Sequence, residues 1–455
     1  MSTLEQMPVL EKYQSYPEYK DSGVDWLGDV PNQWTVTTLR HALSSVKNGS
    51  TATQLNEGIE TVAISRIETI SAGEINPDKV GFVELVDSLH NYKLNIGDIL
   101  FSHINSLSMV GNVAQYHSTT PLYHGMNLLR LQPSAKVESR FLLWWLKSSF
   151  ARRSVEASAK PAINQASIAI DQLKNIPCLY PKQEEQRTIA AFLDYETARI
   201  DKLIAKQQRL IELLKEKRQA VISHAVTKGL NPDAPMKNSG VEWLGEVPEH
   251  WEILKGSWLG RLFGSEAVED ADVVLDGDVA FVKVSTLSLD ELSPQDPEWF
   301  VSPQTASRVR AKRDFIAFPK RGAAIFTNKV NIVPYCSVID PNLMGWEVKK
   351  TINTTYLAYC LKIRRLDDIA DVSTVPQINN KHISPQRFPV PPRIEQDEIV
   401  ERIEEGILLF DKLLLKAGDA ILLMQERRTA LISSAVTGKI DLRDWVAPTE
   451  EVSNG

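Results

Sequence analysis

Two long stretches of the chain carry an apolar residue at every third or fourth position. In residues 185–227 and 395–437 this spacing continues for about five heptads, which favours a coiled coil over a single helix lying on a globular domain. At 1.5 Å per residue, each helix would form a rod of roughly 65 Å. The predicted seam positions are Ile189, Leu193, Ile200, Leu203, Leu210, Leu214, Val221, Ile399, Ile403, Phe410, Leu413, Ala420, Met424 and Leu431.

The region in front of each long helix shows a different pattern. Short runs rich in β-branched and aromatic residues, such as ETVAIS, GDILFS and GNVAQY, and later GDVAFVKV and KVNIVPY, are bounded by Gly, Asn, Asp and Pro. Such runs predict strands and hairpins of a mixed globular domain. Prolines then mark the passage from each domain into its helix: Pro177 and Pro181, and Pro389, Pro391 and Pro392.

The chain repeats itself. SGVDWLGDVPNQW at 22–34 returns as SGVEWLGEVPEHW at 239–251, with nine of thirteen positions identical. The helical segments 185–227 and 395–437 match at 17 of 43 positions. Two copies of more than 200 residues indicate a duplicated domain and helix rather than a solenoid.

These patterns predict an α+β fold with a pseudo-twofold internal duplication. Two globular mixed α/β domains are separated by two long helices, which pair as an antiparallel coiled coil and place the domains at its opposite ends. The predicted segments are an N-terminal extension (1–20), a first globular domain (21–180), a long helix (181–230), a second globular domain (231–390), a second long helix (391–440) and a C-terminal tail (441–455).

Charge and cysteine content restrict the class of protein. The formal net charge of −7 is accounted for by the two ends, because residues 1–34 carry −4 and residues 440–455 carry −3. Any nucleic-acid binding must then depend on local basic clusters. No apolar run approaches the ~20 residues that cross a bilayer, and the acidic N-terminus lacks a signal-peptide pattern. We therefore predict a cytoplasmic protein whose three widely spaced cysteines stay reduced.

Motifs of known catalytic chemistry are missing from the sequence. It contains no G-x-G-x-x-G, no P-loop, no G-x-S-x-G and no H-E-x-x-H, and Pro391-Pro392 lacks the preceding Asn or Asp of an adenine methyltransferase motif. Asp98 is interpreted as a turn residue rather than a nuclease carboxylate. The neighbouring His117 and His124 lack the companions of a metal site, and Trp144-Trp145 is interpreted as core packing rather than base stacking.

The repeated motifs resemble the specificity subunits of type I restriction-modification enzymes. The opening motif SGV[DE]WLG[DE]VPxxW, the P-x-x-E-x-Q-x-x-I start of each helix and its closing R-x-A-x-I-S-x-A-V-T carry the resemblance, which covers nearly the whole chain. FPKRGAAIFTNKVNIV at 318–333 also resembles a recurrent motif of their recognition domains, and GDILFSHINSLSMVGNVA at 97–114 is a looser counterpart.

The resemblance implies a DNA-binding subunit without a catalytic centre. Each target-recognition domain would read one half of an asymmetric, interrupted DNA site, and the helices would set the spacing between the halves. Implied partners are double-stranded DNA, two methyltransferase (M) subunits and, through them, restriction (R) subunits, with no membrane. S-adenosylmethionine would bind to the M subunit, and ATP and Mg²⁺ would bind to the R subunit. This chain would bind no cofactor and no metal.

Candidate DNA contacts come from basic and polar residues of the two recognition domains. The densest basic cluster lies in the second domain, and the alternative interpretation is a solvated surface. The candidates are Arg308, Arg310, Lys312, Arg313, Lys320, Arg321, Thr327, Asn328 and Lys329 in the second domain, and Arg66, His103, Asn105 and Ser106 in the first.

Two other hypotheses remain open on the sequence alone. An independent enzyme, such as a fused nuclease-methyltransferase, should show the motifs that are missing. A coiled-coil DNA-binding scaffold that is not tied to a methyltransferase would share the helices, and a neighbouring gene with an Asn-Pro-Pro-Phe motif would exclude it.

Overall fold

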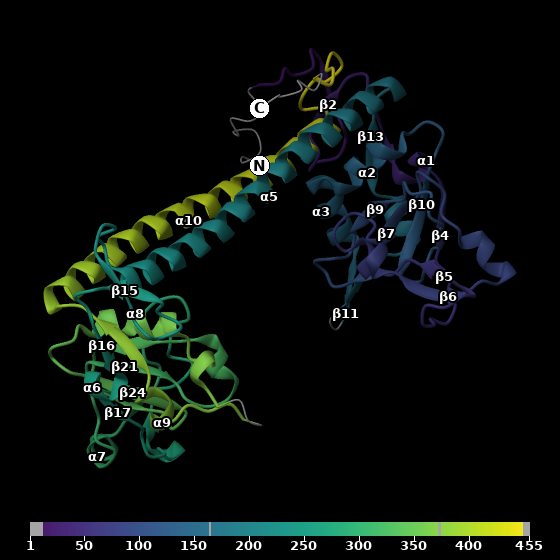
Figure 1. Ribbon diagram of the computed structural model, residues 1–455. Coiled ribbons are helices and arrows are strands. Elements are labelled where there is room, and N and C mark those ends of the chain that lie inside the picture. Colours follow the sequence, from purple (N-terminus) through teal and green to yellow (C-terminus); the bar gives the residue numbers. More distant parts are fainter. Residues whose placement is uncertain (1–11, 163–164, 372–374, 449–455) are drawn as a thin grey trace. The chain divides into compact units, whose positions relative to one another are not determined.

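The computed structural model describes residues 12–162, 165–371 and 375–448 (Figure 1). The chain divides into two compact units. The first contains the described residues up to Gln208 and from Asp419 onward, and the second is Arg209–Gly418. The division passes through the middle of both long helices, α5 (Gln183–Lys228) and α10 (Arg393–Val436), so each unit contains one half of each helix. The predicted segments, by contrast, treated the helices as bodies of their own.

The first unit is built on a four-stranded antiparallel sheet. Its strand order is β4-β10-β7-β9, formed by β4 (Leu43–Asn48), β10 (Leu128–Pro133), β7 (Ile99–Ser102) and β9 (Val113–Gln115). Small strand pairs surround it: β1 (Tyr19–Asp21) with β2 (Asp29–Pro31), β3 (Thr35–Thr38) with β13 (Pro177–Tyr180), β5 (Thr61–Ile64) with β6 (Gly81–Glu84), and β8 (Ile104–Asn105) with β12 (Gln165–Ser167) and β11 (Lys160–Ala162). The helices besides α5 and α10 are α1 (Leu39–Ala42), α2 (Ser139–Lys147), α3 (Ser149–Ser158) and α4 (Ile170–Lys174).

The second unit repeats this plan. Its main sheet has the order β17-β24-β21-β22, with β17 (Gly260–Phe263), β24 (Leu343–Val348), β21 (Phe315–Pro319) and β22 (Asn331–Val333). Its other strands are β14 (Met236–Asn238), β15 (Glu246–Pro248), β16 (Glu252–Lys255), β25 (Arg387–Val390), β18 (Val273–Val274), β20 (Phe300–Val301), β19 (Val279–Val282) and β23 (Ser337–Ile339). Its short helices are α6 (Gly256–Leu259), α7 (Pro303–Arg308), α8 (Thr354–Arg364) and α9 (Asn380–Ile383). The predicted duplication and the predicted strands are confirmed.

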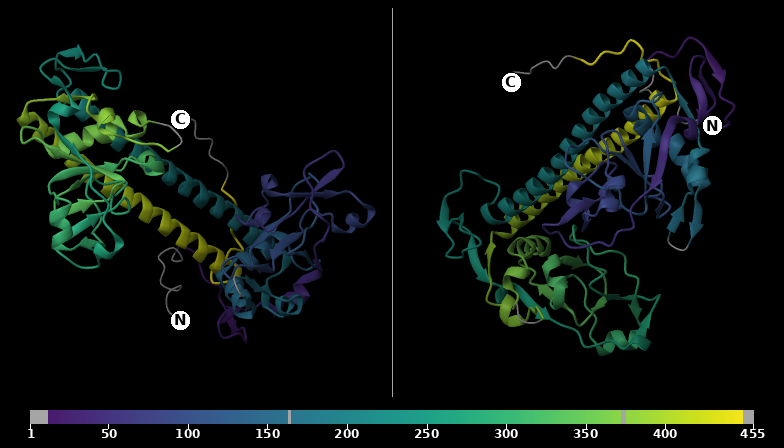
Figure 2. Two further views of the ribbon diagram at one scale, coloured as in Figure 1. Left: turned by 90° about the horizontal axis from the view of Figure 1, so that it is seen from below. Right: turned by 90° about the vertical axis from the view of Figure 1, so that its right-hand side faces the viewer.

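α5 and α10 run antiparallel in each unit (Figure 2). In the first unit the early part of α5 packs against the late part of α10, and Arg428 Nε lies 2.9 Å from Asp201 Oδ1. In the second unit the late part of α5 packs against the early part of α10, where the equivalent Arg218 and Asp411 are 3.8 Å apart. The internal repeat therefore extends to the ion pairs between the helices.

The buried stripe of each helix departs from strict heptads. Leu203, Leu210, Val221 and Leu413 of the predicted seam are 38–43% exposed. Their neighbours Ile204, Ile211, Ile222 and Leu414 are less exposed, and Ala420 is only partly buried. The predicted Ile189, Leu193, Ile200, Ile399, Ile403 and Leu431 are buried, while Leu214, Phe410 and Met424 are partly buried. Since a straight α-helix repeats every 3.6 residues, its inward face moves ahead of a 3.5-residue template along the helix.

A glutamate at the start of each long helix, buried at Glu185 and partly buried at Glu395, ties the opening motif to it. Trp34 Nε1 donates to Glu185 Oε1, and Trp251 Nε1 donates to Glu395 Oε1, both at 3.0 Å. The Tyr16 hydroxyl also donates to Glu185, at 2.5 Å. The predicted N-terminal extension is thus part of the first core from Tyr13 onward, and residues 1–11 lie outside the described residues.

The glutamine that follows each of these glutamates joins the domain to the same helix turn. Gln186 Oε1 accepts from the Glu138 backbone N–H and Gln396 Oε1 from that of Asn353, both at 2.7 Å. Their amide nitrogens donate to the Pro181 and Pro391 carbonyl oxygens at 2.9 and 2.8 Å. The Glu-Gln pair of each copy therefore holds domain and helix together through groups that are shielded from water.

Removing the Glu185 carboxylate should destabilise the first unit. Glu185→Ala leaves two buried donors, the Trp34 indole and the Tyr16 hydroxyl, without their acceptor, at a cost of about 2–4 kcal/mol. The exposed neighbour Glu184 provides the control, because Glu184→Ala removes only a favourable charge at the helix start, worth about 0.5 kcal/mol. Thermal unfolding of both variants tests the anchor, and equal melting temperatures would show that it contributes nothing.

Candidate nucleic-acid interface

A loop that leaves the main sheet occupies the same place in both units. In the first unit residues 103–112, which include β8, connect β7 to β9, and in the second residues 320–330 connect β21 to β22. The first residue of each loop receives a backbone hydrogen bond from a matching partner: Ile168 N–H donates to the His103 carbonyl at 3.0 Å and Ile378 N–H to that of Lys320 at 2.9 Å. We call these segments the strand-exit loops.

The two loops also share a backbone feature near their ends. Gly111 has φ +86° and Asn328 has φ +50°, and each stands two residues before the first hydrophobic residue of the returning strand segment, Val113 or Val330. This left-handed conformation suits glycine and asparagine. The motif resemblance between residues 97–114 and 318–333 therefore corresponds to a common backbone path.

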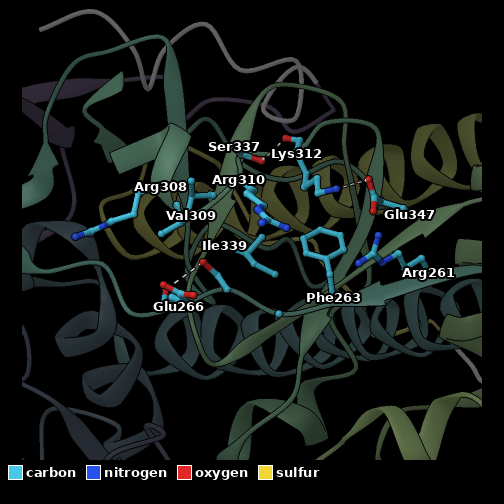
Figure 3. A pocket seen from close by; sticks show the side chains of 13 residues that line it. Arg261, Phe263, Glu266, Arg308, Val309, Arg310, Lys312, Ser337, Ile339 and Glu347 are labelled. Atoms are coloured by element: carbon cyan, nitrogen blue, oxygen red, sulfur yellow. Dashed lines mark hydrogen bonds and ion pairs between the residues drawn. The ribbon is translucent and has the colours of Figure 1, made fainter. Parts of the chain in front are cut away.

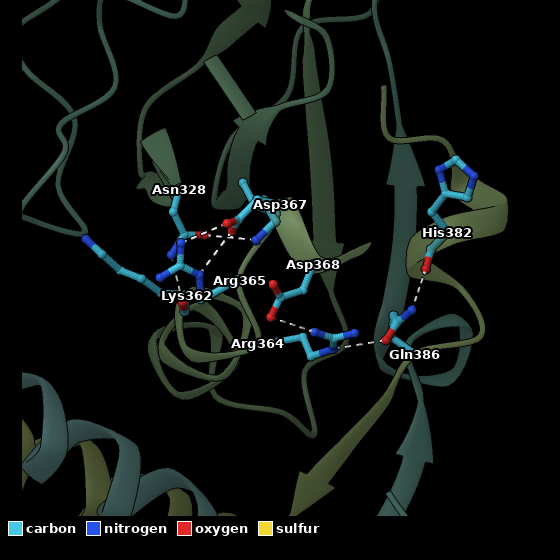
Figure 4. A network of polar contacts seen from close by, with 9 residues as sticks. Asn328, Lys362, Arg364, Arg365, Asp367, Asp368, His382 and Gln386 are labelled. Atoms are coloured by element: carbon cyan, nitrogen blue, oxygen red, sulfur yellow. Dashed lines mark hydrogen bonds and ion pairs between the residues drawn. The ribbon is translucent and has the colours of Figure 1, made fainter. Parts of the chain in front are cut away.

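Asn328 fixes its loop to the helix that follows the sheet (Figure 4). Its side-chain nitrogen donates to the Lys362 carbonyl at 2.8 Å, and its oxygen accepts from Leu366 N–H at 3.0 Å. An Arg365–Asp367 ion pair of 2.7 Å lies beside these bonds. Both ends of the Asn328 amide are thus occupied within the protein, so this predicted contact residue positions the loop.

Arg152 of α3 performs the corresponding role in the first unit. Its guanidinium donates to Asn112 Oδ1 at 2.8 Å and contacts the Ser108 carbonyl oxygen. Sequence reasoning missed this residue, because Arg152 is 40 positions from its partner and belongs to an ordinary amphipathic helix.

The polar candidates of the first unit gather in this loop, with one exception. Asn105 Nδ2 donates to Ser102 Oγ at 3.2 Å, and Ser106 Oγ lies 3.2 Å from Ser108 Oγ. His103 is largely buried, and burial lowers its pKa. Arg66 stands apart, in the turn after β5, where its Nε lies 3.5 Å from Glu68 Oε2.

Three of the basic candidates of the second unit line a cavity of about 420 Å³ (Figure 3). Arg308 Nη2 lies 2.9 Å from Asp272 Oδ2. Lys312 Nζ lies 2.9 Å from Glu347 Oε1 and 5.7 Å from the centre of the Phe263 ring. Arg310 completes the set, and a residue that sequence reasoning missed, Arg261 of β17, lines the cavity with it. Arg261 is about 50 positions from the cluster, so only the strand pairing reveals their proximity.

The remaining basic candidates lie elsewhere in the second unit. Arg313 is exposed and pairs with Asp314 at 3.0 Å. Lys329 Nζ donates to the Val284 carbonyl at 3.1 Å, so it braces the start of β22. Burial and the neighbouring Arg321 lower the pKa of Lys320. Arg321 and Thr327 are exposed on the strand-exit loop. The basic candidates of residues 308–329 are therefore divided between the cavity, the exposed surface and the strand-exit loop.

The interpretation of Trp144-Trp145 as core packing is confirmed, since both side chains are buried. Trp144 Nε1 donates to Asp194 Oδ1 at 2.8 Å, and the same carboxylate pairs with Arg140 at 2.8 Å.

Lys147 Nζ lies 5.2 Å from the Trp144 ring centre. Burial, together with the positive charges of Arg140 and Arg428, lowers the pKa of Lys147 to about 8.

Asp98 has the structural role that its turn position predicts. Its Oδ2 accepts from Asn95 N–H at 2.9 Å and lies 3.9 Å from the buried Arg130. His124 is fully buried, and burial lowers its pKa to about 4.

Within residues 12–162, 165–371 and 375–448 no group of three or more His, Cys, Asp or Glu residues could hold a metal ion. In the same ranges no helix is long and apolar enough to cross a membrane.

The chain is similar to the specificity subunits of type I restriction enzymes. The family model of the type I restriction modification DNA specificity domain matches residues 34–213. The putative type I restriction enzyme MjaX specificity subunit of Methanocaldococcus jannaschii is 36% identical over 253 residues, 55% of this chain and only 57% of that relative. The EcoKI specificity subunit of Escherichia coli K12 is 23% identical over 458 residues, 94% of this chain and 93% of the relative.

Solved structures of low sequence identity share the fold. A chain from a structure on complex assembly and conformational transition of the type I R-M system aligns with a TM-score of 0.72 at 14% identity, covering 90% of this chain and 99% of its own. The HsdS subunit from Thermoanaerobacter tengcongensis aligns with a TM-score of 0.56 at 14% identity, covering 90% and 98%.

The duplicated α+β fold is shared with these solved structures. Residues 34–213 match the type I restriction modification DNA specificity domain, and the chain is similar along most of its length to the EcoKI specificity subunit.

The buried Lys147 should make stability depend on pH. Its pKa is about 8 in the folded chain and about 10.5 when solvated, so between these values the folded state binds fewer protons than the unfolded state. Stability at this site therefore rises from pH 8 to 10.5 and is lowest below pH 8. Lys147→Met should raise the melting temperature at pH 7, and the gain should shrink as the pH rises above 8, to a small fraction by pH 10.

The exposed Lys136 of the same unit serves as the control, and Lys136→Met should leave the melting temperature unchanged at both pH values. A Lys147→Met variant that melts no higher than the parent at pH 7 would show that the buried ammonium does not destabilise the fold.

Proposed function

We propose that the chain is a type I specificity subunit that reads a bipartite, asymmetric DNA sequence, with one half-site for each unit. The observation that carries the proposal is that the same framework presents the same loop twice with different side chains. At the loop start His103 corresponds to Lys320 and Ile104 to Arg321, and at its end Asn112 corresponds to Lys329. Each base pair presents its own pattern of donors, acceptors and methyl groups in the major groove, and protein side chains that match the pattern recognise it. Different side chains on one framework therefore suit different half-sites.

The paired helices support a fixed spacing between the half-sites. Each unit contains half of α5 and half of α10, and hydrogen bonds from the buried indoles of Trp34 and Trp251 to Glu185 and Glu395 tie each globular domain to them. We propose that the helices act as the ruler that leaves a constant unread gap in the DNA.

The outer faces of the helices favour protein partners. Leu408 and Leu415 in the second unit are 72% and 67% exposed, and Leu422 and Leu423 in the first are 60% and 64% exposed. Such a run of exposed leucines is unusual for a surface that only meets water. We propose that these faces dock two adenine-N6 methyltransferase subunits, and through them restriction subunits.

This arrangement also divides the cofactors among the subunits. S-adenosylmethionine would serve the methyltransferase subunits, and ATP with Mg²⁺ the restriction subunits, in the cytoplasm where the DNA substrate lies. In this proposal the chain supplies only recognition and assembly.

A domain exchange tests the proposal. Residues 35–160 are replaced by the matching region of a relative with a different target, and the chain is co-expressed with its methyltransferase. Sequencing of methyladenine in the host genome should show one half of the motif changed, with the other half and the gap preserved. The reciprocal exchange of residues 252–370 should change only the other half. Alteration of both halves by either exchange would contradict independent readers.

A further inference from the structure

The cavity of the second unit contains two cationic side chains without a partner. Its lining includes four cations, Arg261, Arg308, Arg310 and Lys312, against the carboxylates of Glu266 and Glu347. Arg308 and Lys312 are neutralised by Asp272 and Glu347. Among the residues that the structure describes, the guanidinium groups of Arg261 and Arg310 have no hydrogen bond or ion pair. The cavity is therefore positively charged, with free donors facing it.

The backbone at Arg310 is held in an unfavourable conformation. Its φ is +56°, the left-handed region, which suits glycine far better than arginine. The conformation ends α7 (Pro303–Arg308): Ala311 N–H donates to the Ala306 carbonyl at 2.9 Å and Arg310 N–H to that of Ser307 at 3.4 Å, the pattern of a helix C-terminus. This turn presents the Arg310 side chain to the cavity beside the Phe263 ring (Figure 3).

The first unit has no such arrangement at the equivalent strand positions. Arg261 faces Glu347 across β17 and β24, and the matching pair across β4 and β10 is Ser45 and Gln132. Both side chains are uncharged, and Gln132 Nε2 donates to Asp98 Oδ1 at 3.1 Å. The free cation at this strand position therefore belongs to the second unit.

We propose that this cavity binds one phosphate group between Arg261 and Arg310. Guanidinium groups donate paired hydrogen bonds to phosphate oxygens, and the Lys312–Glu347 ion pair keeps the cavity wall in place. The phosphate comes either from the DNA backbone, in which case the inference rests on the proposed function, or from a free nucleotide. The site would make binding by the second domain more dependent on salt than binding by the first.

Two variants and one control test the site in the full chain. Arg261→Gln and Arg310→Gly each remove a free guanidinium, and Arg310→Gly also relieves the left-handed backbone, so its melting temperature should not fall. Arg313→Gln is the control, because Arg313 is exposed and paired with Asp314 outside the cavity.

The first measurement is fluorescence anisotropy with a random-sequence DNA duplex over a range of salt concentrations. If the phosphate belongs to DNA, each cavity variant should bind about three- to tenfold more weakly and lower the salt slope by about one, while the control lowers neither. The second measurement is calorimetric titration with inorganic phosphate and with ATP. If the source is a free nucleotide, binding heats of the parent should be lost in both cavity variants.

Each outcome decides one question. Cavity variants that match the control in both measurements overturn the site, even when the parent binds DNA well. A parent that binds phosphate through the cavity but fails to bind any DNA supports the site and contradicts the proposed function.

Discussion

The hydrogen bond between a helix glutamate and a buried tryptophan of the opening motif is the constraint on which the rest of the architecture depends. Glu185 with Trp34, and Glu395 with Trp251, have the same 3.0 Å distance. Both indoles are buried, so removal of either carboxylate would leave an unpaired buried donor rather than a harmless gap. Since the bond joins the first residues of a globular domain to the first turns of a long helix, it determines how that domain is held on the helices.

The duplication gives this anchor its functional meaning. Each unit carries a strand-exit loop on its own four-stranded antiparallel sheet. The loop of the first unit is held by Arg152, and the loop of the second by Asn328. In the proposed function, a constant scaffold with variable loop residues would allow each unit to change its target without disturbing the helices. The basic cavity lined by Arg261 and Arg310 shows that the units also differ in how they hold charge.

Sequence patterns predicted the elements better than the contacts. Repeats and periodicity predicted the duplicated α+β fold and both long helices, because each depends on local spacing. The strict heptad template misplaced the inward face at Leu203, where a straight helix presents Ile204 instead. The basic cluster at 308–321, with Thr327, Asn328 and Lys329 beyond it, was predicted to supply DNA contacts together. Its members point to different surroundings because the chain turns through β21 and a loop in between. Arg261 could not be associated with it, since cross-strand register is absent from the sequence.

The ruler role of the helices is the central claim of the proposed function, and changing their length tests it most directly. Seven residues are added to both helices at equivalent points, after Gln207 and Ala417, so that two nearly complete turns keep the buried faces aligned. The added length is about 10 Å at 1.5 Å per residue, or about three base pairs at 3.4 Å each. Methylated sites sequenced from cells that express this variant should keep both half-sites and show a gap about three base pairs longer. An active variant with an unchanged gap would contradict the account.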